Sequence, residues 1–155
     1  MVALPRYSPW RADGPLIPRF TDIGGLAVPM INATGAASVK GSTVHVSSVV
    51  SRGVSLTDQG VPDCIGAVYD GGIPDGGVVR VIVAGVAEVL FVSAATRGFL
   101  ARTFVATDAD AQPGKAKSEA VPSSPFATDK HFSEIGHIIE STTGAGLAMV
   151  VLHFN

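Results

Sequence analysis

The chain of 155 residues has the length of one compact domain, and its net charge of −2 gives no electrostatic basis for binding nucleic acid. Only 15% of the residues are charged and 46% are hydrophobic, which excludes a largely disordered chain and leaves more apolar surface than a small domain buries within itself. Eighteen glycines and ten prolines interrupt every long helical pattern, so we predict an all-β protein with a small β-barrel or sandwich-like body. Part of its apolar surface is expected to be buried against other chains.

Residues 1–35 are predicted to form an extended, proline-rich N-terminal arm, because proline fixes φ and removes a backbone donor. Five of the ten prolines fall there: Pro5, Pro9, Pro15, Pro18 and Pro29. The alternative is a free terminal tail, but such tails are poor in aromatic residues, whereas this segment contains Tyr7, Trp10 and Phe20. We therefore expect these three side chains to make contacts with a partner, with Trp10 as the main anchor.

The remaining residues, 36–155, are predicted to form a single β-rich domain with seven strands separated by turn residues. The predicted strands are 43–50, 64–69, 78–84, 86–92, 98–105, 135–140 and 147–154. Gly85 is expected to let the chain bend between two of them. The apolar run 78–92 contains Arg80 and Glu88 and is shorter than the roughly 20 residues that span a bilayer, so no membrane partner is expected.

Residues 106–130 are predicted to form a long surface loop, since they are mostly small and polar and include three prolines. Within it, the spacing of Asp108, Asp110 and Glu119 is similar to that of a calcium loop. Pro113, however, stands where such a loop requires glycine. We expect a solvated loop without a bound metal.

Three potential metal ligands, His131, Glu134 and His137, follow this loop, but their spacing matches neither zinc-protease motif. On a regular strand the two histidines would share one face and Glu134 would point to the other. A metal would then need a further ligand, and His153 is the only other histidine downstream. The sequence favours structural or interface histidines, with no metal and no other cofactor.

No catalytic signature accompanies these residues. A nucleophile elbow is missing, and the paired glycines at 71–72 and 76–77 lack the Lys-Ser/Thr of a phosphate loop and are typical of hairpin turns. Cys64 has no basic neighbour that would activate it, so we expect a small buried apolar side chain. The prediction is therefore a protein that is not an enzyme, with no catalytic residues.

Four segments carry a family resemblance: DGGVVRVIVAGVAEV at 75–89, AATRG at 94–98, IGHIIE at 135–140 and VVLHFN at 150–155. Their order resembles that of the decoration proteins of tailed bacteriophages, also called cement or head-stabilisation proteins, over about residues 40–155. The resemblance implies a compact β-barrel-like body that binds the major capsid protein as a homotrimer. It further implies a structural role on the outer capsid surface of the virion after synthesis in the bacterial cytoplasm, with an arm that contacts the shell or a neighbouring subunit.

Two alternatives stay open at this point. One is a receptor-binding or tail-associated virion module, which carbohydrate binding or its position on the particle would distinguish from a decoration protein. The other is a trimeric β-rich enzyme of the dUTPase type, for which the aspartate-containing substrate motifs and the glycine-rich C-terminal arm are missing from the sequence.

Overall fold

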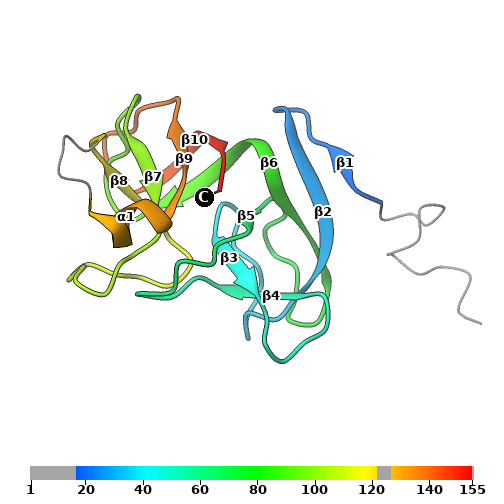
Figure 1. The fold of residues 1–155 in the computed structure, drawn as a ribbon. Helices are drawn as coiled ribbons and strands as arrows, with labels where there is room; N and C mark the ends of the chain where they lie inside the picture. Colours follow the sequence, from blue (N-terminus) through cyan, green and yellow to red (C-terminus); the bar gives the residue numbers. More distant parts are fainter. Residues whose placement is uncertain (1–16, 122–126, 155) are drawn as a thin grey trace, which may run out of the picture.

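The computed structural model describes residues 17–121 and 127–154 (Figure 1). Its strands and single short helix are β1 (Arg19–Phe20), β2 (Gly25–Asn32), β3 (Thr43–Val46), β4 (Gly53–Leu56), β5 (Gly66–Val68), β6 (Val78–Phe91), β7 (Leu100–Arg102), β8 (Lys117–Glu119), α1 (Thr128–Phe132), β9 (Glu134–Ile138) and β10 (Gly146–Leu152). The prediction of an all-β protein is confirmed. No helix within the described residues has the length and apolar character needed to cross a membrane.

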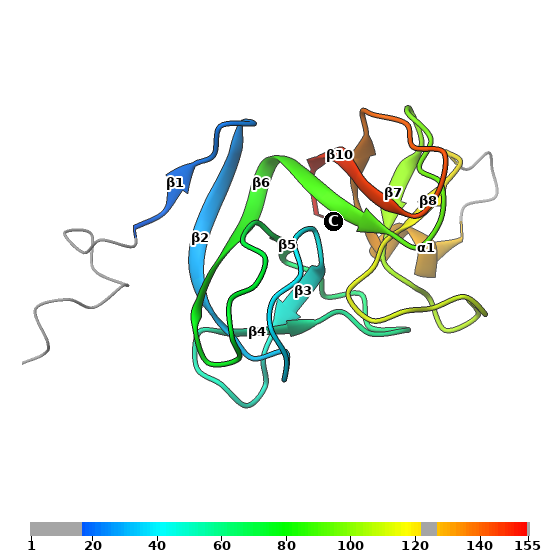
Figure 2. The ribbon, with the colours of Figure 1, turned by 180° about the vertical axis from the view of Figure 1, so that it is seen from behind.

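The longest strand, β6, runs through the middle of the molecule and belongs to two groups of strands (Figures 1 and 2). Its first half pairs with β2 and β5, and its second half pairs with β10. Between the halves, Gly85 has φ of +79°, and a Cβ at this position would lie 2.4 Å from the carbonyl oxygen of Gly24. Only glycine fits both the conformation and the close approach. The predicted bend at Gly85 therefore occurs within one continuous strand.

The first group of strands closes a ring in the order β2–β4–β3–β5–β6, with β6 returning to β2. We call β2 to β5 and the first half of β6 the N-terminal ring. The β2–β4 pair is parallel and the other pairs are antiparallel. Its fully buried centre consists of Val44, Val54, Val68, Val79 and Val81. Valine suits these positions because its branched side chain packs well on a pleated surface.

The second group continues from β6 in the order β10–β9–β7–β8. Ala116, just before β8, brings the chain back to the end of β6: its amide donates to Leu90 O (2.8 Å), and its carbonyl accepts from the amide of Val92 (3.0 Å). These strands and the second half of β6 form the C-terminal ring. Its core combines alanines with larger side chains such as Phe91, Ile135 and Ile138. Small residues next to large ones let the interior fill without voids.

Strand β2 corrects the predicted extent of the arm. Gly25–Asn32 was expected to lie in the arm of residues 1–35, yet it pairs with β6 along most of its length and alternates buried with half-buried residues up to Met30. Pro29 is tolerated because β2 meets β4 only at Ile31 and Asn32, so no strand needs a donor from Pro29 on that edge. The β-rich body thus begins before the boundary predicted at residue 35, and residues 1–16 lie outside the described part of the chain.

All the predicted strands occur at least in part, and besides β1 and β2, which fall in the predicted arm, two strands of the body, β4 and β8, were not expected. The predicted strand 43–50 ends at Val46, and the predicted strands 78–84 and 86–92 join as β6. The predicted loop 106–130 contains β8 and the start of α1. β8 has the sequence Lys-Ser-Glu, without the apolar alternation that marks a strand, and it exists because its backbone pairs with β7.

Candidate functional site

The predicted interaction residues lie near the N-terminus. Tyr7 and Trp10 are outside the described residues. Phe20 lies on β1, which pairs with β2 so that Phe20 stands opposite Leu26. Its side chain is 79% exposed, although a ring of this size is usually buried. β1 and β8 lie at opposite ends of the molecule in both views (Figures 1 and 2). Phe20, on β1, is therefore far from β8.

A second exposed apolar group lies in the turn between β3 and β4. Val49 is 88% exposed, and Val46 and Val50 are also exposed. Val49 and Val50 line an open groove of about 500 Å³ together with Ile31 and His45. The sequence prediction placed Val49 and Val50 in a strand, but Arg52 adopts a positive φ of 58° in a tight turn here, which ends β3 early.

A third apolar group surrounds α1 and the C-terminal segment. Phe132 is 53% exposed, and it lines a small pocket together with Phe154, Cys64 and Ile135. Cys64 is half-buried, packs against the core of the C-terminal ring, and has its thiol pKa raised to about 12 by burial. A thiol with such a pKa is protonated at neutral pH, which agrees with the predicted apolar role of Cys64.

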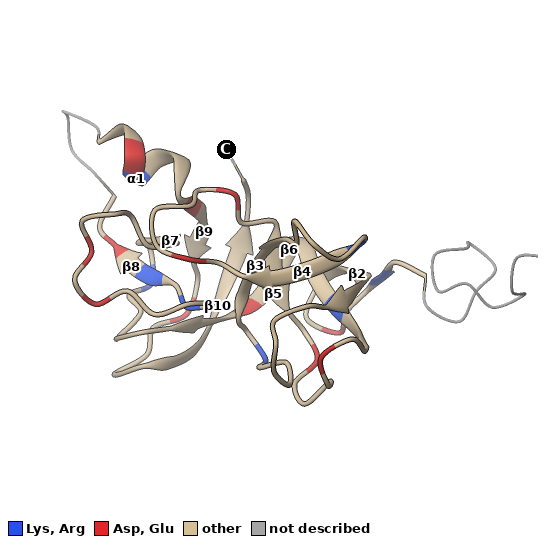
Figure 3. Cartoon of the chain, turned by 90° about the horizontal axis from the view of Figure 1, so that it is seen from below, with Lys and Arg blue, Asp and Glu red and all other residues tan. Residues whose placement is uncertain are grey.

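The carboxylates of the predicted loop 106–130 form a network of ion pairs, which corrects the expectation of a solvated loop. Arg102, only 3% exposed, donates to Asp108 Oδ2 (2.6 Å) and to Glu119 Oε2 (2.9 Å). Lys117 Nζ lies 3.2 Å from Asp108 and 2.8 Å from Asp110. Figure 3 shows acidic and basic positions side by side around β8. Each carboxylate of the calcium-like pattern therefore has a side-chain cation as its partner.

This network shifts the ionisation of its carboxylates. Hydrogen bonds from Arg102 hold the pKa of Asp108 well below its ordinary value of 3.8. Burial alone would raise the pKa of Glu119, but hydrogen bonds from Lys130 and Arg102 bring it below its ordinary value of 4.5. Both groups are therefore anions at neutral pH and balance the buried guanidinium. The arrangement has a structural role, because it leaves no acid or base free for proton transfer.

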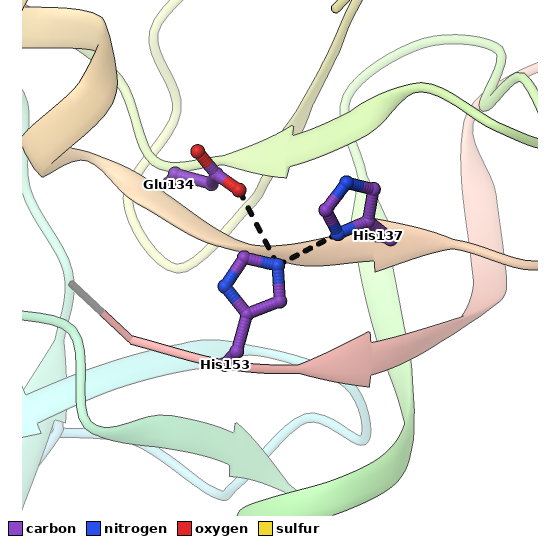
Figure 4. A group of neighbouring side chains, drawn as sticks. All are labelled: Glu134, His137 and His153. Carbon is purple, nitrogen blue, oxygen red and sulfur yellow. Dashed lines mark hydrogen bonds and ion pairs between the residues drawn. The ribbon is translucent and has the colours of Figure 1, made fainter.

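A separate cluster of titratable side chains joins β9 to the end of β10 (Figure 4). Nδ1 of His137 lies 2.7 Å from Nε2 of His153, and that same Nε2 lies 3.3 Å from Oε1 of Glu134. Glu134 is buried, His153 is half-buried and His137 is exposed. His131 lies on α1, with its Nδ1 3.9 Å from Oε2 of Glu134. The cluster is thus open to solvent on the His137 side.

A β-bulge explains why Glu134 meets the histidines, whereas on a regular strand it would point away from His137. Between β7 and β9, Ala101 stands opposite Gly136 and Arg102 stands opposite Glu134, so Ile135 has no counterpart on β7. Such an extra residue reverses the alternation of side chains. Ile135 consequently points into the core, and Glu134 lies on the same side as His137.

Sequence reasoning considered these residues but did not predict their grouping. A regular strand carrying both His131 and His137 was the arrangement considered, whereas His131 lies on the helix α1, ahead of β9. The histidine that lies beside His137 is His153 and not His131. Val151 pairs with His137, and His153 lies two residues after Val151 on the same face. Side chains alternate with a period of two along the paired strands β9 and β10. This alternation was the sequence signal that could have linked His137 with His153.

Neither a protein-family model nor a curated protein sequence matches the chain. Among solved structures, the crystal structure of the N base of head fiber gp8.5 in bacteriophage phi29 has a similar fold, with a TM-score of 0.52. The similarity covers 82% of this chain and 92% of that chain at 14% sequence identity. The chain therefore shares the fold of a component of a bacteriophage head fiber.

Proposed function

We propose that this chain is a structural protein of a bacteriophage head, which binds the outer surface of the assembled capsid and stabilises it. The observation that carries the proposal is the similarity of fold to the N base of the phi29 head fiber, which extends over 92% of that chain. The sequence resemblance to decoration proteins rests on different evidence, the motifs at 75–89, 94–98, 135–140 and 150–155, and supports the same location. The proposed partner is the major capsid protein.

The exposed apolar side chains support an assembly role. Phe20 on β1 and Val49 in the β3–β4 turn are largely exposed, and Phe132 is exposed on α1. Exposed apolar side chains that are close neighbours, such as Val46, Val49 and Val50 around the β3–β4 turn, are typical of protein–protein contacts. A protein that binds only the assembled shell stabilises that shell by mass action, and the effect is repeated at every binding site.

A homotrimer is the proposed oligomer, since a low charge content and positive mean hydropathy in a short chain favour burial between copies. Light scattering coupled to size exclusion at micromolar concentration measures this directly. A mass of three chains supports the trimer. A monomer over the whole concentration range would contradict a trimer in solution.

Binding to heads tests the function. Heads are assembled from the major capsid protein encoded in the same genome, incubated with this protein and sedimented, and cryo-electron microscopy locates the bound copies. We expect saturable binding to the outer surface and a higher melting temperature of decorated heads. Absence of binding, or binding to tails only, would contradict the proposal and would favour a receptor-binding or tail-associated module.

Variants then test the arm. We expect Trp10→Ala to weaken binding by about 2 kcal/mol, a roughly thirtyfold loss of affinity, and Phe20→Ala to weaken it less. Val121→Ala is the matched control, because Val121 is also exposed but follows β8 at the opposite end of the molecule. Unchanged affinity in a folded variant lacking residues 1–16 would move the contact surface to the β-rich body.

A second candidate function is the base of a longer head fiber, favoured by the fact that the similar structure is itself the N base of such a fiber. The same cryo-electron microscopy experiment separates the two. A decoration protein ends at the β-rich body on the capsid surface. A fiber base would instead show further density that projects outward from each bound copy.

A further inference from the structure

We propose that Glu134, His137 and His153 form a binding site for a first-row transition-metal ion, specifically Zn²⁺. The sequence alone favoured no metal here, because a regular strand would point Glu134 away from the histidines. The bulge at Ile135 and the β9–β10 register remove that objection, and each residue offers one ligand atom within 4.8 Å of the others. Two imidazoles and one carboxylate are a recognised ligand set for zinc.

The hydrogen bonding of the cluster is the first argument. Nε2 of His153 makes both close contacts, to His137 Nδ1 at 2.7 Å and to Glu134 Oε1 at 3.3 Å. A ring nitrogen carries either one hydrogen or one lone pair. If Nε2 of His153 carries a hydrogen, Nδ1 of His137 and Oε1 of Glu134 must share it. If Nε2 carries a lone pair, that lone pair faces the lone pairs of the Glu134 oxygen. A metal cation instead accepts a lone pair from all three atoms at once.

The burial of Glu134 is the second argument. Its side chain is 8% exposed, and its ion-pair partners within the described residues are His153 and His131. Glu119, by contrast, is paired with an arginine and a lysine, Arg102 and Lys130. A buried carboxylate is costly without a charged partner, and a divalent ion supplies that charge.

The two distances at His153 fit a tetrahedral zinc ion after a small adjustment, and the ligand atoms of His137 and Glu134, which lie within 4.8 Å of each other, must approach by up to about 1.4 Å. Ligand atoms about 2.1 Å from a tetrahedral centre lie roughly 3.4 Å apart, close to the separation of Glu134 Oε1 and His153 Nε2, 3.3 Å. The two imidazole nitrogens must separate by roughly 0.7 Å from their 2.7 Å distance. Rotation of the exposed His137 ring provides this movement, and the solvent side of the cluster leaves a fourth coordination position for water.

Bound zinc would tie the end of β10 to β9. Since β10 is also the partner of the second half of β6, the ion would hold the C-terminal ring closed at its last strand. At a zinc concentration 100 times Kd, the melting temperature is expected to rise by about 5–10 °C. This role is independent of whether the protein binds a capsid.

The test uses the full chain, purified without a histidine tag, stripped with chelator and titrated with ZnCl₂ by isothermal calorimetry, with metal analysis after dialysis. We expect one Zn²⁺ per chain. His137→Ala and Glu134→Gln are each expected to lower the affinity at least about tenfold. His45→Ala is the matched control: His45 lies on β3 beside Asp63 (3.3 Å), another histidine–carboxylate pair, and its loss should leave zinc binding unchanged.

A spectroscopic measurement guards against misfolded variants. Co²⁺ substituted into the wild type and into His45→Ala should give the visible absorption of a tetrahedral site, which His137→Ala should lose while keeping its far-ultraviolet circular dichroism. Absence of zinc binding in the wild type would overturn the proposal. Equal affinities of His45→Ala and His137→Ala for zinc would overturn it as well.

Discussion

The two rings share β6 but accommodate their buried polar groups in different ways. In the N-terminal ring the polar groups are neutral: the Asn32 amide donates to Ala36 O and Ile73 O, both at 2.9 Å, and the hydroxyls of Thr43 and Thr57 lie 2.5 Å apart. In the C-terminal half they include, besides the hydroxyls of Thr103 and Ser133, the charged Arg102 between two carboxylates. A buried ion-pair network is therefore found in one half of the molecule, whereas the ion pair Asp70–Arg80 of the other half involves an exposed arginine.

The difference follows from the segments that close each ring. The N-terminal ring is closed by β2, an apolar strand that pairs with β6 over seven positions. The C-terminal ring is closed by β8 and the loop before it, which are polar and contribute Asp108, Lys117 and Glu119. A polar closing segment has few apolar side chains to bury, so ion pairs hold it in place. Each ring should therefore be most sensitive to a different kind of substitution.

The largest effect is expected from Arg102→Ala in the C-terminal ring. It leaves Asp108 and Glu119 without their shared buried cation, and removal of one partner from a buried pair costs about 3–5 kcal/mol. Urea denaturation at pH 7 measures the change in the free energy of unfolding. A loss below about 1 kcal/mol would show that the network behaves like a surface ion pair.

Gly85→Ala tests the strand that the two rings share. The positive φ and the close approach to Gly24 O are expected to cost roughly 1–3 kcal/mol of unfolding free energy. Gly72→Ala is the matched control, because Gly72 has φ of +81° but open space where the added Cβ would lie. If both variants lose the same stability in thermal unfolding, the close approach at Gly85 contributes nothing beyond the backbone conformation.

Acidification is expected to weaken the C-terminal ring first. The pKa of Asp108 is lowered in the folded state, so its contribution is complete above the ordinary value of 3.8 and is lost as the pH falls toward the lower folded pKa. Unfolding free energies measured from pH 6 to pH 2 should therefore fall at the acidic end. Asp108→Asn should flatten that decrease more than Asp70→Asn, whose partner Arg80 is exposed; equal slopes would contradict the distinction between the rings.

The smallest effect is expected from Arg80→Ala in the N-terminal ring. Arg80 forms a bidentate pair with Asp70 and stacks 4.7 Å from the Tyr69 ring centroid, but its side chain is exposed. An exposed pair of this kind contributes up to about 1 kcal/mol and is weakened by salt. Urea denaturation at low and high salt measures both quantities. A loss as large as that of Arg102→Ala would remove the contrast between the two rings.

Local patterns explain how much of this architecture the sequence predicted. The valine alternation in 78–84 and the glycine at 85 predicted a strand and its bend, because both signals depend only on neighbouring residues. The segment that forms β2 falls in the predicted arm because proline is disfavoured inside a strand, yet its backbone pairs with β6. β8 carried no signal at all, since a polar strand forms only where another strand supplies its backbone partners.

The sequence by itself determined the all-β class and the set of side chains available for chemistry, because composition, turn residues and alternation act locally. Only the tertiary structure decided which of those side chains meet. The spacing of Asp108 and Glu119 is similar to that of a calcium loop, but in the folded chain Arg102, from β7, lies between them. On a regular strand Glu134 would point away from His137, and one bulged residue reverses the direction of its side chain. The pairing of β10 with β9 then places His153 beside both residues. Strand register joins residues that are distant in the chain, so local sequence patterns do not contain it.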